Sequence, residues 1–147
     1  MALKDQITDA MKAAMKAKDS QRLGVVRLIL SACKQVEVDE RIELSDERVL
    51  AILDKMTKQR RDSAKQYAEA GRKDLEDQEN YEIGVIAEFL PAALSEAELA
   101  SLIDQCIAKA GATSAKDMGK VMGLLKPQIQ GRADMGLASQ LVKSKLG

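Results

Sequence analysis

The chain has 147 residues and a mass of 16.0 kDa, which allows one domain or two small ones. Hydrophobic residues make up 46% of it, but only three residues are aromatic, so the core must be built from aliphatic side chains, which argues against a β-sandwich or barrel. Basic and acidic residues number 23 each, and this zero net charge argues against a generally basic polyanion binder but not against a local basic face.

Histidine is absent, and cysteine occurs twice, as Cys33 and Cys106. Ser-His-Asp catalysis, Cys-His catalysis and histidine metal sites are therefore excluded, and two thiols cannot form a four-thiolate zinc site. Both cysteines fall in apolar stretches and are interpreted as reduced core residues, so no metal or cofactor is expected. The first residues lack the apolar run of a signal peptide, and no apolar stretch approaches membrane-spanning length, so we expect a cytoplasmic protein.

Helical periodicity dominates the first half of the chain. Apolar residues at intervals of three and four predict a first amphipathic helix over residues 3–15. Asp19 and Ser20 can cap a second helix, whose apolar residues lie close to one face. The pattern turns polar over residues 37–44, which predicts a loop there.

A third and a fourth helix are predicted before the first proline. Ser45 is followed by two acidic residues, and both an N-cap hydroxyl and negative charge favour a helix N-terminus. This third helix is expected to end near Gly71. Residues 71–81 are charged, and a fourth helix is expected to follow over residues 83–90 until Pro91 ends it.

Residues 93–147 have a different pattern, which predicts three short helices. The first begins at an S-x-x-E capping box, Ser95–Glu98, and is expected to end at Gly111. An S-x-x-D signal at residues 114–117 predicts the start of the second helix, which Pro127 is expected to stop.

We therefore expect an all-α protein with two domains. An N-terminal bundle of long helices occupies residues 1–92, and a small three-helix domain occupies residues 93–147. The first holds 16 basic and 18 acidic residues, and the second holds seven basic and five acidic residues, which gives net charges of −2 and +2. This difference is too small to identify a partner by itself.

Two glycines in the predicted C-terminal domain are the most informative local feature. Gly119 and Gly123 are four residues apart and share a helix face, although glycine in a helix interior costs about 0.5–1 kcal/mol relative to alanine. The simpler interpretation is close helix–helix packing inside the domain. The functional interpretation is a smooth surface that a nucleic-acid backbone or a partner helix approaches closely.

Arg132 lies in the sequence G-R-A-D, which is expected at the start of the last helix. Gly131 can adopt a positive φ there, and Asp134 can cap the helix. In one interpretation Arg132 pairs with Asp134 or Asp117 and fixes the turn. In the other it joins nearby lysines in a patch that binds phosphate groups. These lysines are Lys116, Lys120 and Lys126.

A second candidate surface lies on the predicted third helix. Lys58, Arg61 and Lys65 are spaced to form one stripe, which Arg72 could continue, whereas Arg60 lies off that line. The stripe is interpreted either as a solvated face with internal ion pairs or as a row that follows phosphate groups.

Several ordered motifs can be compared with known families. They are Arg27 with the apolar stretch after it, K-Q-R-R-D-S at 58–63, A-G-R-K-D-L at 70–75, F-L-P at 89–91 with L-S at 94–95, and D-M-G-K-V-M-G at 117–123 with G-R-A-D at 131–134. Together they resemble the YqeY-like family, also called the GatB/YqeY domain family, over the whole chain. The chain departs from the family's pattern after Asp134, where many members have Gly-Lys and this chain has Met135 and Gly136.

The resemblance implies an all-α protein whose C-terminal part is similar to the tail domain of the GatB component of glutamyl/aspartyl-tRNA amidotransferases. In those enzymes the tail contacts tRNA, and catalysis is carried elsewhere. The family label, carbon–nitrogen ligase with glutamine as amido-N-donor, is then expected to describe the relative, because this chain shows no discernible catalytic set.

Three functions stay open at this point. The first is a non-catalytic tRNA-binding accessory module. Its phosphate contacts would be Lys120, Arg132 and Lys126, with close approach at Gly119 and Gly123 and with further contacts at Lys58, Arg61 and Arg72. The second is a protein-interaction module that docks a helix of an aminoacyl-tRNA synthetase or an amidotransferase on the same glycine face. The third is a self-contained enzyme acting on an amide or aminoacyl bond.

Overall fold

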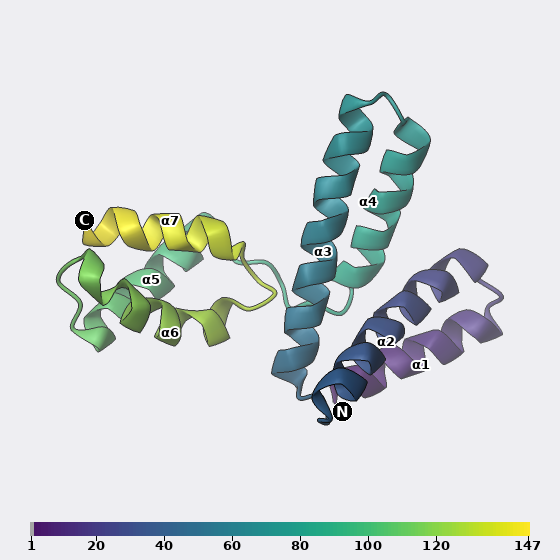
Figure 1. Cartoon of the computed structure of the whole chain (residues 1–147), viewed down its shortest axis with the longest axis horizontal. Coiled ribbons are helices and arrows are strands. Elements are labelled where there is room, and N and C mark those ends of the chain that lie inside the picture. The colour runs from purple at the N-terminus through teal and green to yellow at the C-terminus, as the bar shows by residue number, and fades with distance from the viewer. Residues whose placement is uncertain (1) are drawn as a thin grey trace. The chain divides into compact units, whose positions relative to one another are not determined.

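The computed structural model describes residues 2–147, and every regular element in that range is helical. The all-α class predicted from the sequence is therefore confirmed. The helices are α1 (Leu3–Lys16), α2 (Ser20–Glu40), α3 (Asp46–Glu69), α4 (Lys73–Ala87), α5 (Glu96–Ala110), the short 3₁₀ helix η1 (Ala115–Asp117), α6 (Met118–Ile129) and α7 (Met135–Leu146), as Figure 1 shows. The chain forms two compact units, Met1–Leu90 and Pro91–Gly147.

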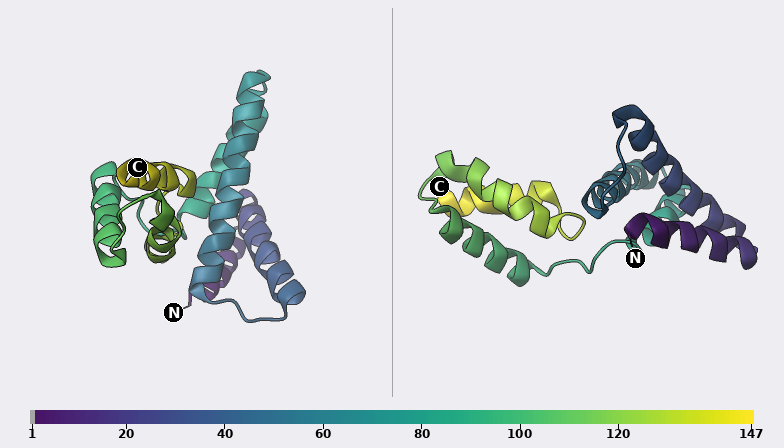
Figure 2. Two further views of the ribbon diagram at one scale, coloured as in Figure 1. Left: turned by 60° about the vertical axis from the view of Figure 1, so that its left-hand side comes forward. Right: turned by 90° about the horizontal axis from the view of Figure 1, so that it is seen from below.

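The first unit consists of two helical hairpins, α1–α2 and α3–α4. Its buried core is drawn from all four helices and consists of Leu3, Ile7, Val25, Val26, Ile29, Cys33, Val49, Leu53, Met56, Val85 and Ile86. Each such aliphatic side chain contributes about 1.5–3 kcal/mol by leaving water. The core uses only the first part of α3 and the last part of α4, and in Figure 1 and the left view of Figure 2 the rest of this hairpin extends beyond α1 and α2.

Short polar side chains start helices α2 and α3 where the sequence predicts them. The carboxylate of Asp19 and the hydroxyl of Ser45 each accept the backbone N–H three residues later, which satisfies a donor that the helix leaves free. Asp46 adds a long-range bond, because its Oδ1 accepts the N–H of Leu3 at 2.9 Å. The starts of α1 and α3 are thereby tied together.

The loop predicted over residues 37–44 is shorter than expected. Helix α2 continues to Glu40, and Arg41 ends it in the left-handed conformation with a φ of 54°. Two ion pairs connect this end of α2 to other helices, since Glu37 pairs with Lys4 of α1, and Glu40 pairs with Arg48 of α3. Lys4 lies 33 residues from Glu37 and Arg48 lies eight residues from Glu40, so the helical periodicity of α2 does not reveal either pair.

The fourth helix also differs from its predicted bounds. It begins at Lys73, within the charged stretch, and its last residue is Ala87. The buried residues of α4 are Glu82, Val85 and Ile86, and all three lie in its C-terminal part. The sequence pattern of a packed helix is therefore visible only there. The polar first turns belong to the projecting part of the hairpin, and their acidic residues Asp74 and Glu76 suit a helix N-terminus.

The second unit packs α5, α6 and α7 around its own core. That core consists of Leu99, Ile103, Cys106, Val121, Leu125, Ile129, Ala138 and Val142. Both bonds of the predicted capping box between Ser95 and Glu98 are present, at 3.1 and 3.4 Å. Gly111 ends α5 with a φ of 64°, as predicted. Asp134 caps α7 by accepting a backbone N–H at 2.8 Å.

The prediction that Pro127 stops the sixth helix is wrong. Helix α6 runs through it to Ile129. A proline in a helix removes the hydrogen bond to the carbonyl four residues earlier, which here belongs to Gly123. Both residues are exposed, so water can satisfy that carbonyl, and only two helical residues follow the proline.

Two further sequence expectations concern buried thiols and membranes. Cys33 and Cys106 are free and buried, which confirms their interpretation as core residues. Burial is also the main reason that the pKa of each thiol is raised. In the described range, none of the helices combines the length and apolarity that a membrane crossing requires.

Candidate functional site

The solvent-exposed side of α6 has two positions without a side chain. Gly119 and Gly123 are both exposed, and an added Cβ at either position would meet no heavy atom within 4 Å among the compared neighbours. The predicted role of these glycines in close helix–helix packing is therefore wrong for this structure. The unfavourable helix propensity of two glycines is not compensated by tight packing inside the unit.

Two lysines flank this bare surface. Helical spacing places Lys126 on one side of the glycines and Lys120 on the other. Both lysines are exposed, and neither makes an ion pair or a side-chain hydrogen bond with any residue from 2 to 147. With Gly119, Gly123 and Pro127 they form a surface that we call the α6 outer face. Lys116 is exposed on η1, directly before α6.

The α6 outer face also offers a backbone acceptor. Pro127 has no N–H to donate, so the carbonyl of Gly123 lacks the bond that it would otherwise receive from four residues on. Glycine at 123 leaves this part of the backbone open to an approaching group. The face therefore combines two exposed cations with a backbone carbonyl that lacks its helical donor.

Arg132 belongs to a different arrangement from the lysines. Its Nε donates a hydrogen bond to the carbonyl of Ala92 at 3.1 Å, and its own carbonyl accepts the N–H of Leu94 at 2.9 Å. Arg132 therefore fastens the segment before α5 to the turn between α6 and α7. The predicted pairing with an aspartate is wrong, because Asp117 accepts the N–H of Thr113, and Asp134 caps α7.

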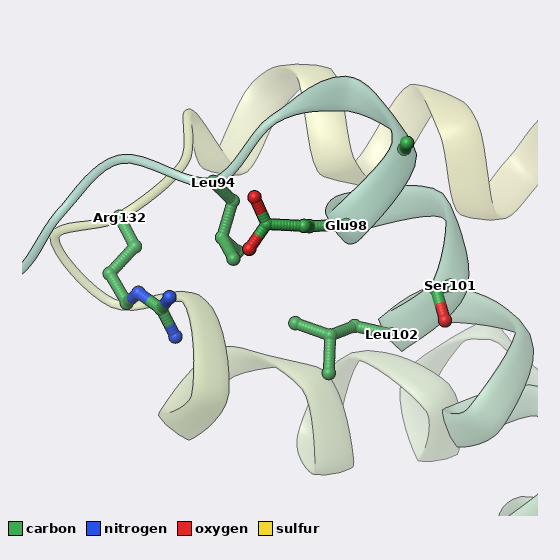
Figure 3. A pocket seen from close by; sticks show the side chains of 6 residues that line it. Leu94, Glu98, Ser101, Leu102 and Arg132 are labelled. Carbon is green, nitrogen blue, oxygen red and sulfur yellow. The ribbon is translucent and has the colours of Figure 1, made fainter.

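The guanidinium of Arg132 also borders an open pocket of about 450 Å³ (Figure 3). The other lining residues are Leu94, Ala97, Glu98, Ser101 and Leu102. In Figure 3 Arg132 comes from the turn between α6 and α7, whereas Glu98 comes from α5 and Leu94 from the segment before it. The carboxylate of Glu98 in the lining makes this pocket less suited to a phosphate group than the α6 outer face, because like charges repel.

The α3 stripe lies on the part of the α3–α4 hairpin that projects from the first unit. Lys58, Arg61 and Lys65 are exposed there and have no ion-pair partner among residues 2–147. Arg60, which lies off the stripe, has a structural role instead. Its Nε contacts the buried Glu82 at 3.2 Å, and this ion pair joins α3 to α4.

Arg72 does not present a free cation. It lies at the start of α4, and its guanidinium makes two hydrogen bonds to the carboxylate of Asp74, at 3.3 and 3.4 Å. This contact is the main reason that the pKa of Asp74 is lowered and that of Arg72 is raised. A phosphate would have to compete with Asp74 for Arg72.

The structure thus separates the predicted site residues into several places. Gly119, Lys120, Gly123 and Lys126 share one helix face in the second unit. Arg132 lies on a turn of that unit, and the residues of α3 and α4 lie in the first unit. Pro127 also belongs to the α6 outer face and was not predicted as a site residue, although it follows Gly123 by four residues in the sequence. No group of three or more histidine, cysteine, aspartate or glutamate side chains within residues 2–147 is placed to hold a metal ion.

Comparison with known proteins extends these observations. A model of the family described as "Yqey-like protein" matches residues 4–146. The curated relatives include proteins named "Altered inheritance of mitochondria protein 41, mitochondrial". The one from Lachancea thermotolerans is 39% identical over 93 residues, which is 60% of this chain and 49% of the relative. The one from Clavispora lusitaniae is 35% identical over 98 residues, which is 65% of this chain and 57% of the relative. The chain spans about half the length of the curated relatives it matches.

The names of these relatives contradict the cytoplasmic location expected from the sequence. All of the relatives just described are named as mitochondrial proteins. The expectation rested on the lack of an apolar signal segment and of a membrane-length stretch. Proteins of the cytosol and of the mitochondrial matrix share both features, so neither feature distinguishes these locations.

Proposed function

Because the chain belongs to the YqeY-like family, we propose that it is a non-catalytic tRNA-binding accessory module, related to the tail of tRNA-dependent amidotransferases. In this proposal residues 93–147 form the RNA-binding domain, and residues 1–92 form a separate helical domain. The carbon–nitrogen ligase label of the family then belongs to the relatives that act together with an amidase.

The α6 outer face is the single observation that carries this proposal. Lys120 and Lys126 can each contact a phosphate, and both are exposed and unpaired within the described chain. Between them Gly119 and Gly123 let the nucleic-acid backbone come closer than side chains would allow. Recognition of shape and backbone suits a chain with only three aromatic residues for base stacking.

The carbonyl of Gly123 gives a reason for RNA rather than DNA. It lacks its helical donor because of Pro127, and it lies between the two lysines. A ribose 2′-hydroxyl can donate a hydrogen bond to such an acceptor, whereas deoxyribose cannot. We therefore propose that tRNA binds more tightly than duplex DNA of similar charge.

The other predicted contact residues have smaller roles in this proposal. Lys58 and Arg61 on the projecting hairpin form a second phosphate-contacting stripe. Arg132 acts mainly by positioning the segment around Ala92, since its Nε is already bonded there. Arg72 contributes least, because Asp74 competes for its guanidinium.

Charge reversal on α6 tests the proposal. Binding of the full chain to total tRNA is measured, with mitochondrial tRNA as a second probe and duplex DNA as the comparison. The Lys120→Glu/Lys126→Glu variant should lose at least about tenfold in affinity for tRNA. Lys109→Glu/Lys143→Glu is the matched control, because it changes the charge of the same unit equally at exposed, unpaired positions. Equal affinity of the α6 variant and this control would refute the proposal.

The second candidate function is binding of a protein partner, because a helix could approach the glycines of the α6 outer face as closely as a nucleic-acid backbone could. Its partner would be an aminoacyl-tRNA synthetase or an amidotransferase, and its binding would depend weakly on salt. A Gly119→Leu variant would then lose the protein partner and retain its affinity for RNA. A self-contained enzyme, the third possibility considered, would show glutaminase or amidotransferase turnover with the purified chain.

A further inference from the structure

Helix α2 carries an exposed surface that the RNA proposal does not use. Leu28 is 47% exposed and Val38 is 59% exposed, although large aliphatic side chains are normally buried. The interval of ten residues places both on one side of the helix, with Ser31 and Gln35 between them. We call these four residues the α2 outer face. Ile42, which is 36% exposed, follows directly after the helix has ended.

A row of cations borders the α2 outer face. Arg27 and Lys34 are seven residues apart and therefore lie along one edge of the helix, and Arg41 follows after seven more residues at the helix end. All three are exposed, and none has an ion-pair or side-chain hydrogen-bond partner in the described part of the chain. We call them the α2 basic edge.

Each carboxylate of α2 has an ion-pair or hydrogen-bond partner, whereas the residues of the α2 basic edge have none among the described residues. Glu37 pairs with Lys4, and Glu40 pairs with Arg48. Asp39 accepts a hydrogen bond from the side-chain nitrogen of Gln35 at 2.9 Å. Two of the three carboxylates of α2 are thus in ion pairs, whereas the basic edge, next to exposed apolar side chains, has no ion-pair partner in the described part of the chain.

We propose that the α2 outer face and the α2 basic edge bind an acidic amphipathic helix of another protein. Apolar side chains of that helix cover Leu28 and Val38, as in the packing of two helices along a seam. Carboxylates spaced by seven residues along its edge pair with Arg27 and Lys34, and a third reaches Arg41. The positive charge of the α2 basic edge selects an acidic partner. The contacts with Leu28 and Val38 set the register in which the two helices pack.

The same surface fits two other occupants less well. Antiparallel pairing of two copies would bring one basic edge against the other, and like charges at such short distances repel. A membrane would need a continuous apolar face, whereas Ser31 and Gln35 interrupt this one. A helical partner tolerates polar residues within its seam.

A synthetic peptide tests the proposal with the full chain. The probe is a labelled helix of about three heptads, with leucine at both seam positions and glutamate along both flanks. Fluorescence anisotropy should show saturable binding in the micromolar range. The Arg27→Glu/Lys34→Glu variant should weaken it by at least about tenfold, and Leu28→Ser/Val38→Ser should weaken it similarly. All four positions are exposed, and circular dichroism checks that the variants stay helical.

Two controls decide the outcome. Lys12→Glu/Lys16→Glu changes two exposed, unpaired lysines of α1, carries the same change of charge, and should keep its affinity within about twofold. A peptide of the same composition with its leucines out of register should not bind. The proposal is overturned by absence of saturable binding, by equal losses in both charge variants, or by anionic vesicles that bind the chain through Arg27 and Lys34 while the peptide does not.

Discussion

The Nε of Arg132 donates a hydrogen bond to the carbonyl of Ala92, 40 residues earlier in the chain, at 3.1 Å. The contact holds the segment before α5 on the turn between α6 and α7, and the backbone bond from Leu94 to the carbonyl of Arg132 supports it. The side chain therefore stabilises the second unit in addition to any role at a phosphate.

Removal of this contact should loosen the segment. We expect Arg132→Ala to lower the free energy of unfolding by about 1 kcal/mol, which is typical of one hydrogen bond. Arg132→Lys keeps the charge but lacks the Nε–H, so it should not restore full stability. Hydrogen exchange at the N–H of Leu94 measures the effect directly. Unchanged exchange in Arg132→Ala would show that the backbone alone holds the segment.

Glycine at position 123 should reduce the stability of the protein. Space around its Cβ position is open, so Gly123→Ala should raise the free energy of unfolding by about 0.5–1 kcal/mol through better helix propensity. Gly111→Ala is the opposing control, because the φ of 64° at Gly111 disfavours a side chain. Denaturant unfolding of both variants checks the prediction, which fails if Gly123→Ala is the less stable of the two.

The ion pair between Arg60 and Glu82 should be important for the first unit. Both side chains are largely buried, at 16% and 12% exposure, and Glu82 also accepts a hydrogen bond from Gln78. Glu82→Ala leaves a largely buried guanidinium unpaired, so we expect a loss of about 2–4 kcal/mol in urea unfolding. The exposed pair Lys73–Asp77 on the same helix is the comparison, and Asp77→Ala should cost less than about 0.5 kcal/mol. Equal losses would contradict this account.

Glu79 should make stability depend on pH. Burial raises its pKa, the nearby charge of Glu82 raises it further, and Arg60 lowers it. The folded chain therefore keeps this proton to a higher pH than the unfolded chain does, so stability falls as pH rises through the interval between the two pKa values. Glu79→Gln should melt at a higher temperature than the parent at about pH 7, and the difference should disappear near pH 3, below both values. A difference of the same size at both pH values would contradict the assignment.

Local signals in the sequence predicted the starts of α2, α3, α5 and α7, whereas Ser114 makes no cap bond and precedes only the short 3₁₀ helix η1. An N-cap acts on backbone groups two or three residues away, so Asp19, Ser45, Ser95 and Asp134 could be recognised without knowledge of the fold. The start of α4 at Lys73 could not be recognised from the sequence. Its first turns lie on the projecting part of the α3–α4 hairpin and carry little apolar periodicity.

The candidate site was predictable in part for the same reason. The pairing of Gly119 with Gly123 on one face follows from their spacing, but whether the face is packed or open depends on the other helices. The contact between Arg132 and Ala92 joins residues that are distant in sequence, so only the folded structure reveals it. The exposure of Gly123 and Pro127, which lets α6 continue through the proline, likewise follows from the packing of the unit and not from the local sequence.

The salt dependence of tRNA binding tests the central claim most directly. The logarithm of the association constant is measured against the logarithm of salt concentration for the parent chain and for Lys120→Gln/Lys126→Gln. If both lysines contact phosphates, the parent binds tRNA with a steep negative slope, and the variant binds more weakly with a slope reduced by about 1.5–2. A parent chain that does not bind tRNA at low salt, or a variant with an unchanged slope, would contradict the account.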